Sequence, residues 1–306
     1  MDTRFLESFV NVVECGSIAE AARRLNLTPA GVGQRLRALE AEIGARLVVR
    51  SGRTITATAA GRAIIERARQ VLREIRDLST IATDDTLAGE LHLGAVATAI
   101  TGILPDVMVA MRDAHPKVDI IIAPGYSFDL YSQILAGELD GAIMSRPYFS
   151  LPKTCGWKTL REEPLIVLAP ASLAGADAHA VLATQPFIRY AQKLWGGRLA
   201  ETYLRRAGIS PNERFELGTL DAIAVLVDRG LGVSLVPDWA PPWPEGLALA
   251  KLPLPGKPPT RHMGLLWTRA SVRIRLVQAF LECAIQTTAS TMAAADATPS
   301  SRPEDQ

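Results

Sequence analysis

The chain has 306 residues, of which 48% are hydrophobic and 21% are charged, and its formal net charge is +1. This length and composition predict two or three globular domains with sizeable cores, and the three widely separated cysteines argue against a disulfide framework or a metal cluster. No secretory signal and no apolar run of about 18 residues is recognisable, so we expect a cytoplasmic protein without membrane spans.

Positive charge is concentrated in residues 21–62. This segment holds eight arginines and two glutamates, so it carries a charge of +6, and the rest of the chain carries −5. A compact basic segment on a slightly acidic chain favours contact between one module and a polyanion, although a solvated helix surface would have the same charge.

The first three predicted helices have the spacing of a helix-turn-helix. Apolar residues recur at helical intervals over residues 4–14, 17–26 and 28–44. Ser17 and Thr28 begin the second and third of these segments, and both side chains are good N-caps. Because only a short turn separates the second helix from the third, we interpret the pair as a helix-turn-helix.

A small β-wing and a long helix follow. Residues 47–49 and 54–56 read as two short strands, with Arg50 and Arg53 at the tip of the wing. Residues 59–82 then form a helical pattern with a sustained apolar stripe. Because the wing alone cannot cover this stripe, we expect the helix to pair with a second copy of the chain.

From residue 89 onward, strand and helix patterns alternate. Residues 89–147 read as strand, helix, strand, helix and strand, with one helix over 98–116, and a similar alternation covers 164–239. Such alternation implies parallel sheets flanked by helices. We predict two α/β lobes, with the chain crossing between them near 162–165 and again near 264–267.

Several short motifs occur in a characteristic order. They are F-x-x-V-x-E-x-G-S at 9–17, A-A-x-x-L at 21–25, R-x-L-E at 37–40, G-x-x-L-x-x-R at 44–50, T-x-A-G at 58–61, G-E-L-D at 137–140, R-G-L-G at 229–232 and L-V-P at 235–237. In order and spacing they resemble the LysR-type transcriptional regulator family, and the resemblance covers about residues 3–289.

The resemblance implies an α+β multidomain chain. Its parts are a winged helix-turn-helix DNA-binding domain at 1–58, a dimerising linker helix at 59–88, a two-lobed, periplasmic-binding-protein-like α/β effector domain at 89–289 and a tail at 290–306. The first lobe takes about 89–162 and 267–289, and the second takes about 163–266. The tail is small, polar and Pro-containing, so we expect it to be disordered.

The resemblance also implies that the third helix reads DNA. The expected DNA contacts are Thr28, Gln34, Arg35, Arg37, Arg50 and Arg53. Arg35 is the first candidate for a base contact, because a guanidinium can bind guanine through two hydrogen bonds. Arg37 is expected on phosphate, unless it pairs on the surface with Glu40 or Glu42. Residues 28–33 depart from the family's usual Ser-Gln-(Pro or Ser)-Ala-Val-Ser, so we expect different bases to be read.

The family's effector pocket lies where strands end and helices begin. The expected pocket residues are Thr98, Thr101, Ser127, Phe128, Arg146, Tyr190, Trp195, Thr219 and Pro237. Helix N-termini at these positions suit polar or anionic ligands. The alternatives are plain N-caps for the Thr and Ser residues, core packing for Trp195 and surface charge for Arg146 and Lys193. If those two cations face the cleft, a small organic acid is the favoured effector.

The sequence therefore predicts a sequence-specific DNA-binding transcriptional regulator controlled by a small-molecule effector. Its expected partners are double-stranded operator DNA, a second or further copies in a homodimer or homotetramer, and RNA polymerase as a further candidate. No enzyme, cofactor or metal site is predicted, because the four histidines have no metal-ligand spacing and phosphate-loop and G-x-S-x-G motifs are missing. The alternative is a two-lobed cytoplasmic small-molecule-binding protein whose N-terminal module only oligomerises, without DNA-binding output.

Overall fold

The computed structural model describes the chain at residues 1–52, 54–83 and 87–297. Its residues divide into two compact units, Met1–Thr86 and Leu87–Gln306. Each unit has its own hydrophobic core, and the description takes them one at a time.

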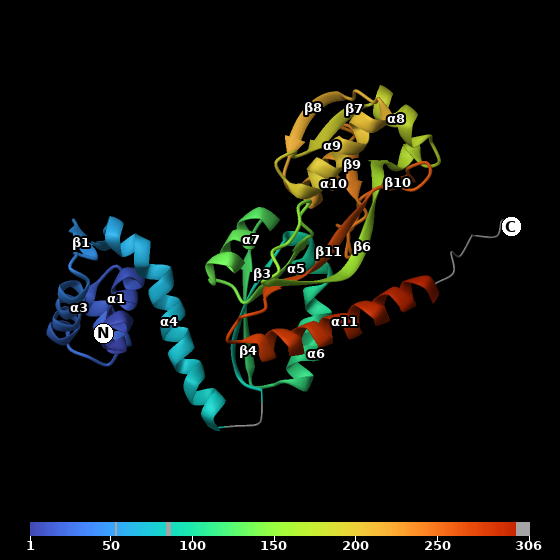
Figure 1. The fold of residues 1–306 in the computed structure, drawn as a ribbon. Helices are drawn as coiled ribbons and strands as arrows, with labels where there is room; N and C mark the ends of the chain where they lie inside the picture. The colour runs from blue at the N-terminus through green and yellow to red at the C-terminus, as the bar shows by residue number, and fades with distance from the viewer. Residues whose placement is uncertain (53, 84–86, 298–306) are drawn as a thin grey trace. The chain divides into compact units, whose positions relative to one another are not determined.

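The N-terminal unit is a winged helix-turn-helix followed by a long helix (Figure 1). Its elements are α1 (Thr3–Cys15), α2 (Ile18–Arg24), α3 (Pro29–Ile43), β1 (Val48–Ser51), β2 (Thr54–Ala57) and α4 (Ala59–Thr83). The Ser17 hydroxyl accepts from the backbone N–H of Glu20 at 3.4 Å, and that of Thr28 accepts from Gly31 at 3.1 Å. The two predicted N-caps therefore begin α2 and α3.

The core of this unit fixes α3 against the other helices. Phe9 from α1, Ala21 from α2 and Leu39 from α3 are fully buried in one cluster. Burying an aromatic or aliphatic side chain of this size contributes roughly 1.5–3 kcal/mol. The buried face of α3 leaves its polar face at the surface.

The first half of α4 packs on its own domain. Ile65 and Ala68 are buried in the same cluster as α1, and Val71 packs against it, whereas Ile75 is exposed. We predicted that this helix pairs with a second copy, because the wing alone cannot cover its apolar stripe. The core formed by α1 covers the first turns of the stripe, and the pairing of the helix with a second copy stays a prediction.

The second unit contains two lobes. Elements of the first lobe are β3 (Gly89–Ala95), α5 (Ala97–Gly102), α6 (Leu104–Ala114), β4 (Val118–Pro124), α7 (Ser127–Ala136), β5 (Gly141–Ser145) and the final helix α11 (Ile274–Ala297). Strand β3 lies between β4 and β5, and all three are parallel. The carboxyl ends of these strands therefore lie at one edge of the sheet.

The second lobe has a more irregular sheet. Its elements are the short 3₁₀ segment η1 (Ala171–Leu173), α8 (Ala178–Thr184), β7 (Pro186–Tyr190), α9 (Trp195–Ala207), β8 (Asn212–Leu217), α10 (Leu220–Asp228), β9 (Ser234–Pro237) and β10 (Leu249–Pro253). Strands β7 and β8 are parallel, whereas β9 and β10 pair antiparallel with the end of a long strand, β6 (Cys155–Pro170). We did not predict α8, β10 or the first half of β6.

Two strands, β6 and β11 (Thr260–Thr268), carry the chain between the lobes (Figure 1). Leu160 lies in the core of the first lobe and Leu165 in that of the second, so β6 crosses between them. On the return, Met263 is already buried in the first lobe. The crossing in β11 therefore lies before Met263 and not at 264–267, because the apolar run that we took for the crossing is packed entirely into one lobe.

Two helices differ from their predictions. The single helix expected over 98–116 is broken into α5 and α6 at Ile103, which has φ −121° and ψ −49°. Pro105 follows in the first turn of α6, where its missing N–H costs nothing. Helix α11 continues to Ala297, so a disordered tail from 290 is wrong up to that residue; the helix extends because the segment is rich in alanine. The rest of the predicted tail, 298–306, lies outside the described residues.

Within the described ranges, no helix combines the length and the apolar character needed to cross a lipid bilayer.

Candidate functional site

Helix α3 of the N-terminal unit presents a polar face to the surface. Thr28, Gln34 and Arg37 are exposed, and Arg35 is half-buried. Val32 and the other apolar residues of this helix are buried on the opposite side. The helix N-terminus and the polar face together form a surface of the kind that contacts a phosphate backbone and base edges.

The ion pairs proposed for Arg37 are not formed. The Glu40 carboxylate accepts hydrogen bonds from the backbone N–H groups of Leu47, at 2.7 Å, and Val48, at 3.3 Å. Glu42 lies 3.4 Å from the N-terminal amine. Within the described part of the chain, Arg37 makes no ion pair, so its guanidinium is free to bind another group.

Arg35 lies near the start of α1. Its charge contributes to lowering the pKa of Asp2 to about 2, although the main cause is the side-chain hydrogen bond from Arg4, followed by a backbone hydrogen bond from the same residue. Among the described residues, Arg35 forms neither a hydrogen bond nor an ion pair through its side chain. The N–H donors of the Arg35 guanidinium are therefore available to another group at the surface of the helix-turn-helix.

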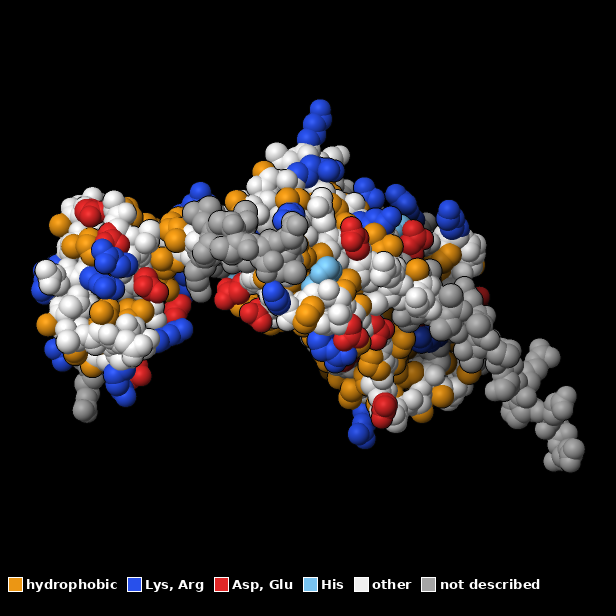
Figure 2. Space-filling model, turned by 90° about the horizontal axis from the view of Figure 1, so that it is seen from below, with side chains coloured by type: hydrophobic (Ala, Val, Ile, Leu, Met, Phe, Trp, Pro, Cys, Tyr) orange, Lys and Arg blue, Asp and Glu red, His pale blue; other side chains and the backbone are white. Residues whose placement is uncertain are grey.

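The wing contributes one described arginine. Arg50 is exposed, and its Nε donates to the carbonyl of Gly52 at 3.2 Å. Arg53 lies outside the described residues. The two arginines of α2 are paired, Arg23 with Glu20 and Arg24 with Glu14. Figure 2 shows basic and acidic side chains interspersed over the visible face of this unit. The arginines of α3 differ from those of α2 in having no ion pair among the described residues.

The second unit contains a cavity of about 320 Å³ between its two lobes. From the first lobe it is lined by the residues that follow β3, β4 and β5. From the second lobe it is lined by the segments that precede α9 and α10, and Arg261 of β11 also contributes. The site therefore lies where the strands of the parallel sheet end, the usual place for a ligand in an open α/β sheet.

Besides the short α5, three longer helices begin at this cavity without side-chain caps. Tyr126, Leu194 and Thr219 occupy the N-cap positions of α7, α9 and α10, and none of the three side chains accepts a capping hydrogen bond. The first N–H groups of a helix have no partner within the helix, and they carry partial positive charge. The cavity therefore offers several backbone donors to a polar or anionic group.

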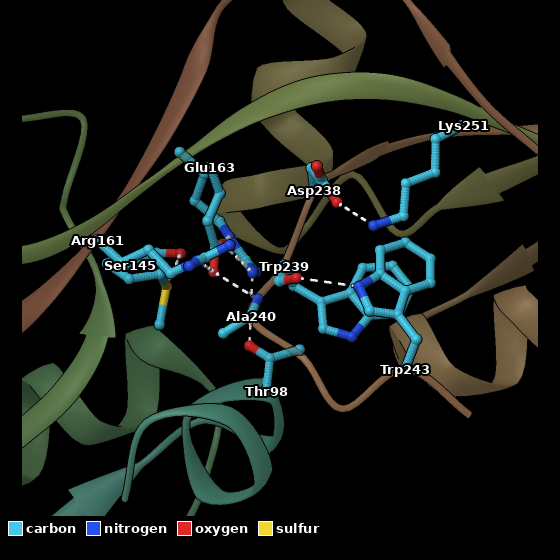
Figure 3. A network of polar contacts seen from close by, with 11 residues as sticks. Thr98, Ser145, Arg161, Glu163, Asp238, Trp239, Ala240, Trp243 and Lys251 are labelled. Carbon is cyan, nitrogen blue, oxygen red and sulfur yellow. Dashed lines mark hydrogen bonds and ion pairs between the residues drawn. The ribbon is translucent and has the colours of Figure 1, made fainter. Parts of the chain in front are cut away.

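A buried ion pair adjoins the cavity. Arg261 is 6% exposed and Glu163 is 1% exposed, and the Arg261 Nε donates to Glu163 Oε2 at 2.6 Å. Figure 3 shows Glu163 close to Arg161, whose Nε is 3.6 Å from Oε1, and to Ala240, whose N–H donates at 3.2 Å. Burial raises the pKa of Glu163, and the nearby Arg261 opposes this effect. Because the guanidinium groups of Arg161 and Arg261 face the single carboxylate of Glu163, the three groups together carry excess positive charge.

No carboxylate lines the cavity among the described residues, whereas Arg261 and Lys193 do. The described residues also contain no group of three or more His, Cys, Asp or Glu side chains that could hold a metal ion. The chemistry of the lining therefore suits an organic anion and not a cation.

Six of the expected effector residues line the cavity: Thr98, Ser127, Phe128, Tyr190, Trp195 and Thr219. The alternative reading as plain N-caps is wrong for Thr98 and Ser127, which lie inside their helices. Thr219 does occupy the N-cap position of α10, but its hydroxyl makes no capping hydrogen bond. Burial raises the pKa of the Tyr190 hydroxyl, which keeps it protonated as a donor.

Three expected residues lie elsewhere. Helix α5 already begins at Ala97, so Thr101 lies in its last turn and not at its start. The Thr101 hydroxyl donates to the Ala97 carbonyl at 3.4 Å. Arg146 lines a separate groove. Pro237 is buried in β9 opposite Leu165, and the antiparallel pairing of this strand keeps its end away from the cavity.

Sequence reasoning missed Arg261. Its partner Glu163 is 98 residues away in sequence, and the pairing depends on the register of β6 and β11. The signal that could have identified it is that Arg261 stands at the start of a largely apolar strand, β11, close to the point where the chain returns from the second lobe to the first.

Two family models match the chain. Residues 3–62 match the model described as "Bacterial regulatory helix-turn-helix protein, lysR family", and residues 84–289 match "LysR substrate binding domain". Together they cover both units described above.

Several relatives are similar to the chain over most of their length. The HTH-type transcriptional activator IlvY of Salmonella typhimurium is 30% identical over 246 residues, which cover 78% of this chain and 83% of IlvY. A full-length OxyR variant from Pseudomonas aeruginosa superimposes with a TM-score of 0.69 at 22% identity, covering 93% of this chain and 94% of that one. Full-length CbnR, in complex with its target DNA, gives a TM-score of 0.68 at 22% identity, covering 94% of this chain and 100% of CbnR.

Proposed function

The chain belongs to the LysR family of bacterial helix-turn-helix regulators, and from this membership we propose that it binds operator DNA through α3 and the wing under the control of a small organic acid bound between its lobes. Members of the family are transcriptional regulators and not enzymes. The chain therefore combines a DNA-binding domain with an effector-binding domain, and the alternative of a binding protein without DNA-binding output is not favoured.

The unpaired arginines of α3 support the DNA contact. Arg35 and Arg37 keep their guanidinium groups free of ion pairs among the described residues, whereas Arg23 and Arg24 on the preceding helix are paired. Arg35 is assigned to a base and Arg37 to phosphate, with Thr28, Gln34, Arg50 and Arg53 as further contacts. A guanidinium without an internal partner can bind DNA without first breaking a salt bridge.

The composition of the interlobe cavity carries the effector proposal. Uncapped helix starts, Arg261 and Lys193 line it, and no described carboxylate does. A carboxylate ligand would accept hydrogen bonds from these donors, with Thr98, Ser127 and Thr219 providing hydroxyl groups. Phe128, Tyr190 and Trp195 would contact the apolar part of the ligand.

The regulator is expected to act as a homodimer or homotetramer in the cytoplasm, with RNA polymerase as a further partner. Two copies match the two-fold symmetry of a typical operator. The effector regulates DNA binding only if it binds one arrangement of the subunits more tightly than another.

Fluorescence anisotropy with the duplex upstream of the protein's own gene tests the proposal. We expect salt-sensitive binding that exceeds binding to a scrambled duplex, and a change in affinity when small carboxylic acids that raise the melting temperature are added. Equal binding to the two duplexes, with and without such acids, would refute sequence-specific regulation.

A further inference from the structure

A second cavity in the same unit has a different chemistry from the effector cavity. Its volume is about 500 Å³, and it extends along α9, between the segment that follows β5 and strand β11. Five arginines line it: Arg146, Arg198, Arg205, Arg206 and Arg261. No Asp or Glu side chain of the described residues does. We call it the arginine groove.

Most of these arginines have no internal partner. Arg146, Arg205 and Arg206 are exposed, and within the part of the chain that the structure describes none of them forms an ion pair. Arg205 and Arg206 lie in the last turn of α9, where the negative end of the helix dipole stabilises positive charge. These three arginines therefore keep their charge without an ion-paired acid, whereas Arg261 is paired with Glu163 and His262 lies beside Glu162.

One arginine is held in place from the opposite wall. The guanidinium of Arg198 lies 4.3 Å from the ring centroid of Tyr148, and its Nη1 donates to the Tyr148 hydroxyl at 3.1 Å. Tyr148 follows β5, whereas Arg198 is on α9, so this contact joins the two walls of the groove. A guanidinium fixed in this way loses less conformational freedom when it binds a ligand.

We propose that the arginine groove binds a compact ligand with two or more negative charges, either a phosphorylated metabolite or a polycarboxylate. A single carboxylate would leave most of the guanidinium groups unneutralised. Arginine is suited to phosphate and carboxylate because its planar donors bind two oxygens at once. The site adjoins the one proposed for the effector, since the two cavities share Ser145, Trp195 and Arg261, and it differs from that one in the four arginines that line only the groove, Arg146, Arg198, Arg205 and Arg206. The proposal does not depend on DNA binding.

Isothermal titration calorimetry of the full-length protein at constant ionic strength tests the groove. The probes are inorganic pyrophosphate, citrate and acetate. We expect pyrophosphate or citrate to bind once per chain, about tenfold or more tighter than acetate. The tighter of the two identifies the ligand as a phosphate compound or a polycarboxylate. Failure of both to bind at about 10 mM overturns the proposal.

Paired variants locate the binding. In R146Q/R206Q, the affinity for the tighter probe should fall about tenfold or more, because two charge-assisted contacts are lost. R214Q is the matched control, since Arg214 is an exposed arginine of the same lobe that does not line the groove, and its affinity should stay within about twofold.

Two outcomes would contradict this location. Equal losses in both variants would show general attraction to a cationic surface. A loss of DNA affinity in R146Q/R206Q, with pyrophosphate and citrate binding unchanged, would show that the groove contacts nucleic acid. The melting temperature of each variant confirms that it is folded.

Discussion

Arg261 Nη2 donates to the Thr98 hydroxyl at 3.4 Å, although the two residues are 163 positions apart in the sequence. The Nε of the same guanidinium donates to Glu163 on the neighbouring strand at 2.6 Å. One buried cation therefore joins the first turn of α5 to the strand on which the chain leaves the first lobe. Because its partners lie in two elements, the Arg261 guanidinium is held at the cavity wall before any ligand arrives.

Replacing Arg261 by Met should lower the free energy of unfolding by about 3 kcal/mol, because it leaves Glu163 buried with only the more distant Arg161. Urea unfolding measures the loss. The double variant R261M/E163Q should recover part of it, since no buried charge then lacks its partner. A loss below about 1 kcal/mol, typical of a surface pair, would contradict this account.

The variant R37Q should weaken binding to specific and scrambled duplexes by similar factors. It should also reduce the slope of log K against log salt by about 1, as expected for the loss of one phosphate contact. Anisotropy titrations at several salt concentrations provide the measurement. R23Q is the control, because Arg23 is already paired with Glu20. An unchanged salt slope in R37Q would remove Arg37 from the interface.

The variant R35Q should act on specificity. If Arg35 contacts a base, its loss should cost about 1–3 kcal/mol on the operator and much less on a scrambled duplex. Measuring the affinities of R35Q and of R37Q for the operator and for the scrambled duplex distinguishes a base contact from a phosphate contact. Equal losses on both duplexes would assign Arg35 to phosphate instead.

The variant T28A should destabilise the N-terminal unit by about 1 kcal/mol, because the Gly31 N–H loses its capping oxygen. Thr28→Ser keeps that oxygen and should stay close to the parent protein. Thermal unfolding followed by circular dichroism distinguishes them. Should T28S be as unstable as T28A, the methyl group and not the cap would be responsible.

Acid sensitivity of the second lobe should depend on Glu213. The hydrogen bond from Arg189 lowers the pKa of Glu213 below its ordinary 4.5, so the pair stabilises the folded state fully above that pH. The stabilisation disappears as the pH falls through the lowered value. E213Q should therefore be less stable than the parent by about 1 kcal/mol at pH 6, and the difference should shrink below pH 4.5.

Urea unfolding over a pH series measures this difference. The control is E216Q, which removes an exposed carboxylate of the same strand that has no partner among the described residues. A difference between E213Q and the parent that stays constant from pH 6 to acid pH would show that Glu213 contributes through packing alone.

Local chemistry explains what the sequence predicted well. Ser17 and Thr28 define helix starts through contacts within three residues, so their caps can be recognised without the fold. Thr98 and Trp195 were placed at the cavity by the resemblance to the LysR family together with the rule that ligands bind where parallel strands end.

Long-range pairing explains what was missed. Arg261 faces Glu163 only because β6 and β11 pair in one particular register, and no local pattern determines that register. Arg146 was expected in the effector cavity because it ends a strand, yet it lines the neighbouring groove. Strand order places a residue near an edge, but side-chain direction decides which cavity it enters.

The register of the two crossing strands limits how the lobes can move. Glu163 and Arg261 are cross-strand neighbours, and Pro164 faces Thr260, so the polypeptide linking the lobes is itself a hydrogen-bonded ribbon. A motion of one lobe against the other would therefore have to bend both strands together, because the ladder and the Glu163–Arg261 ion pair join them.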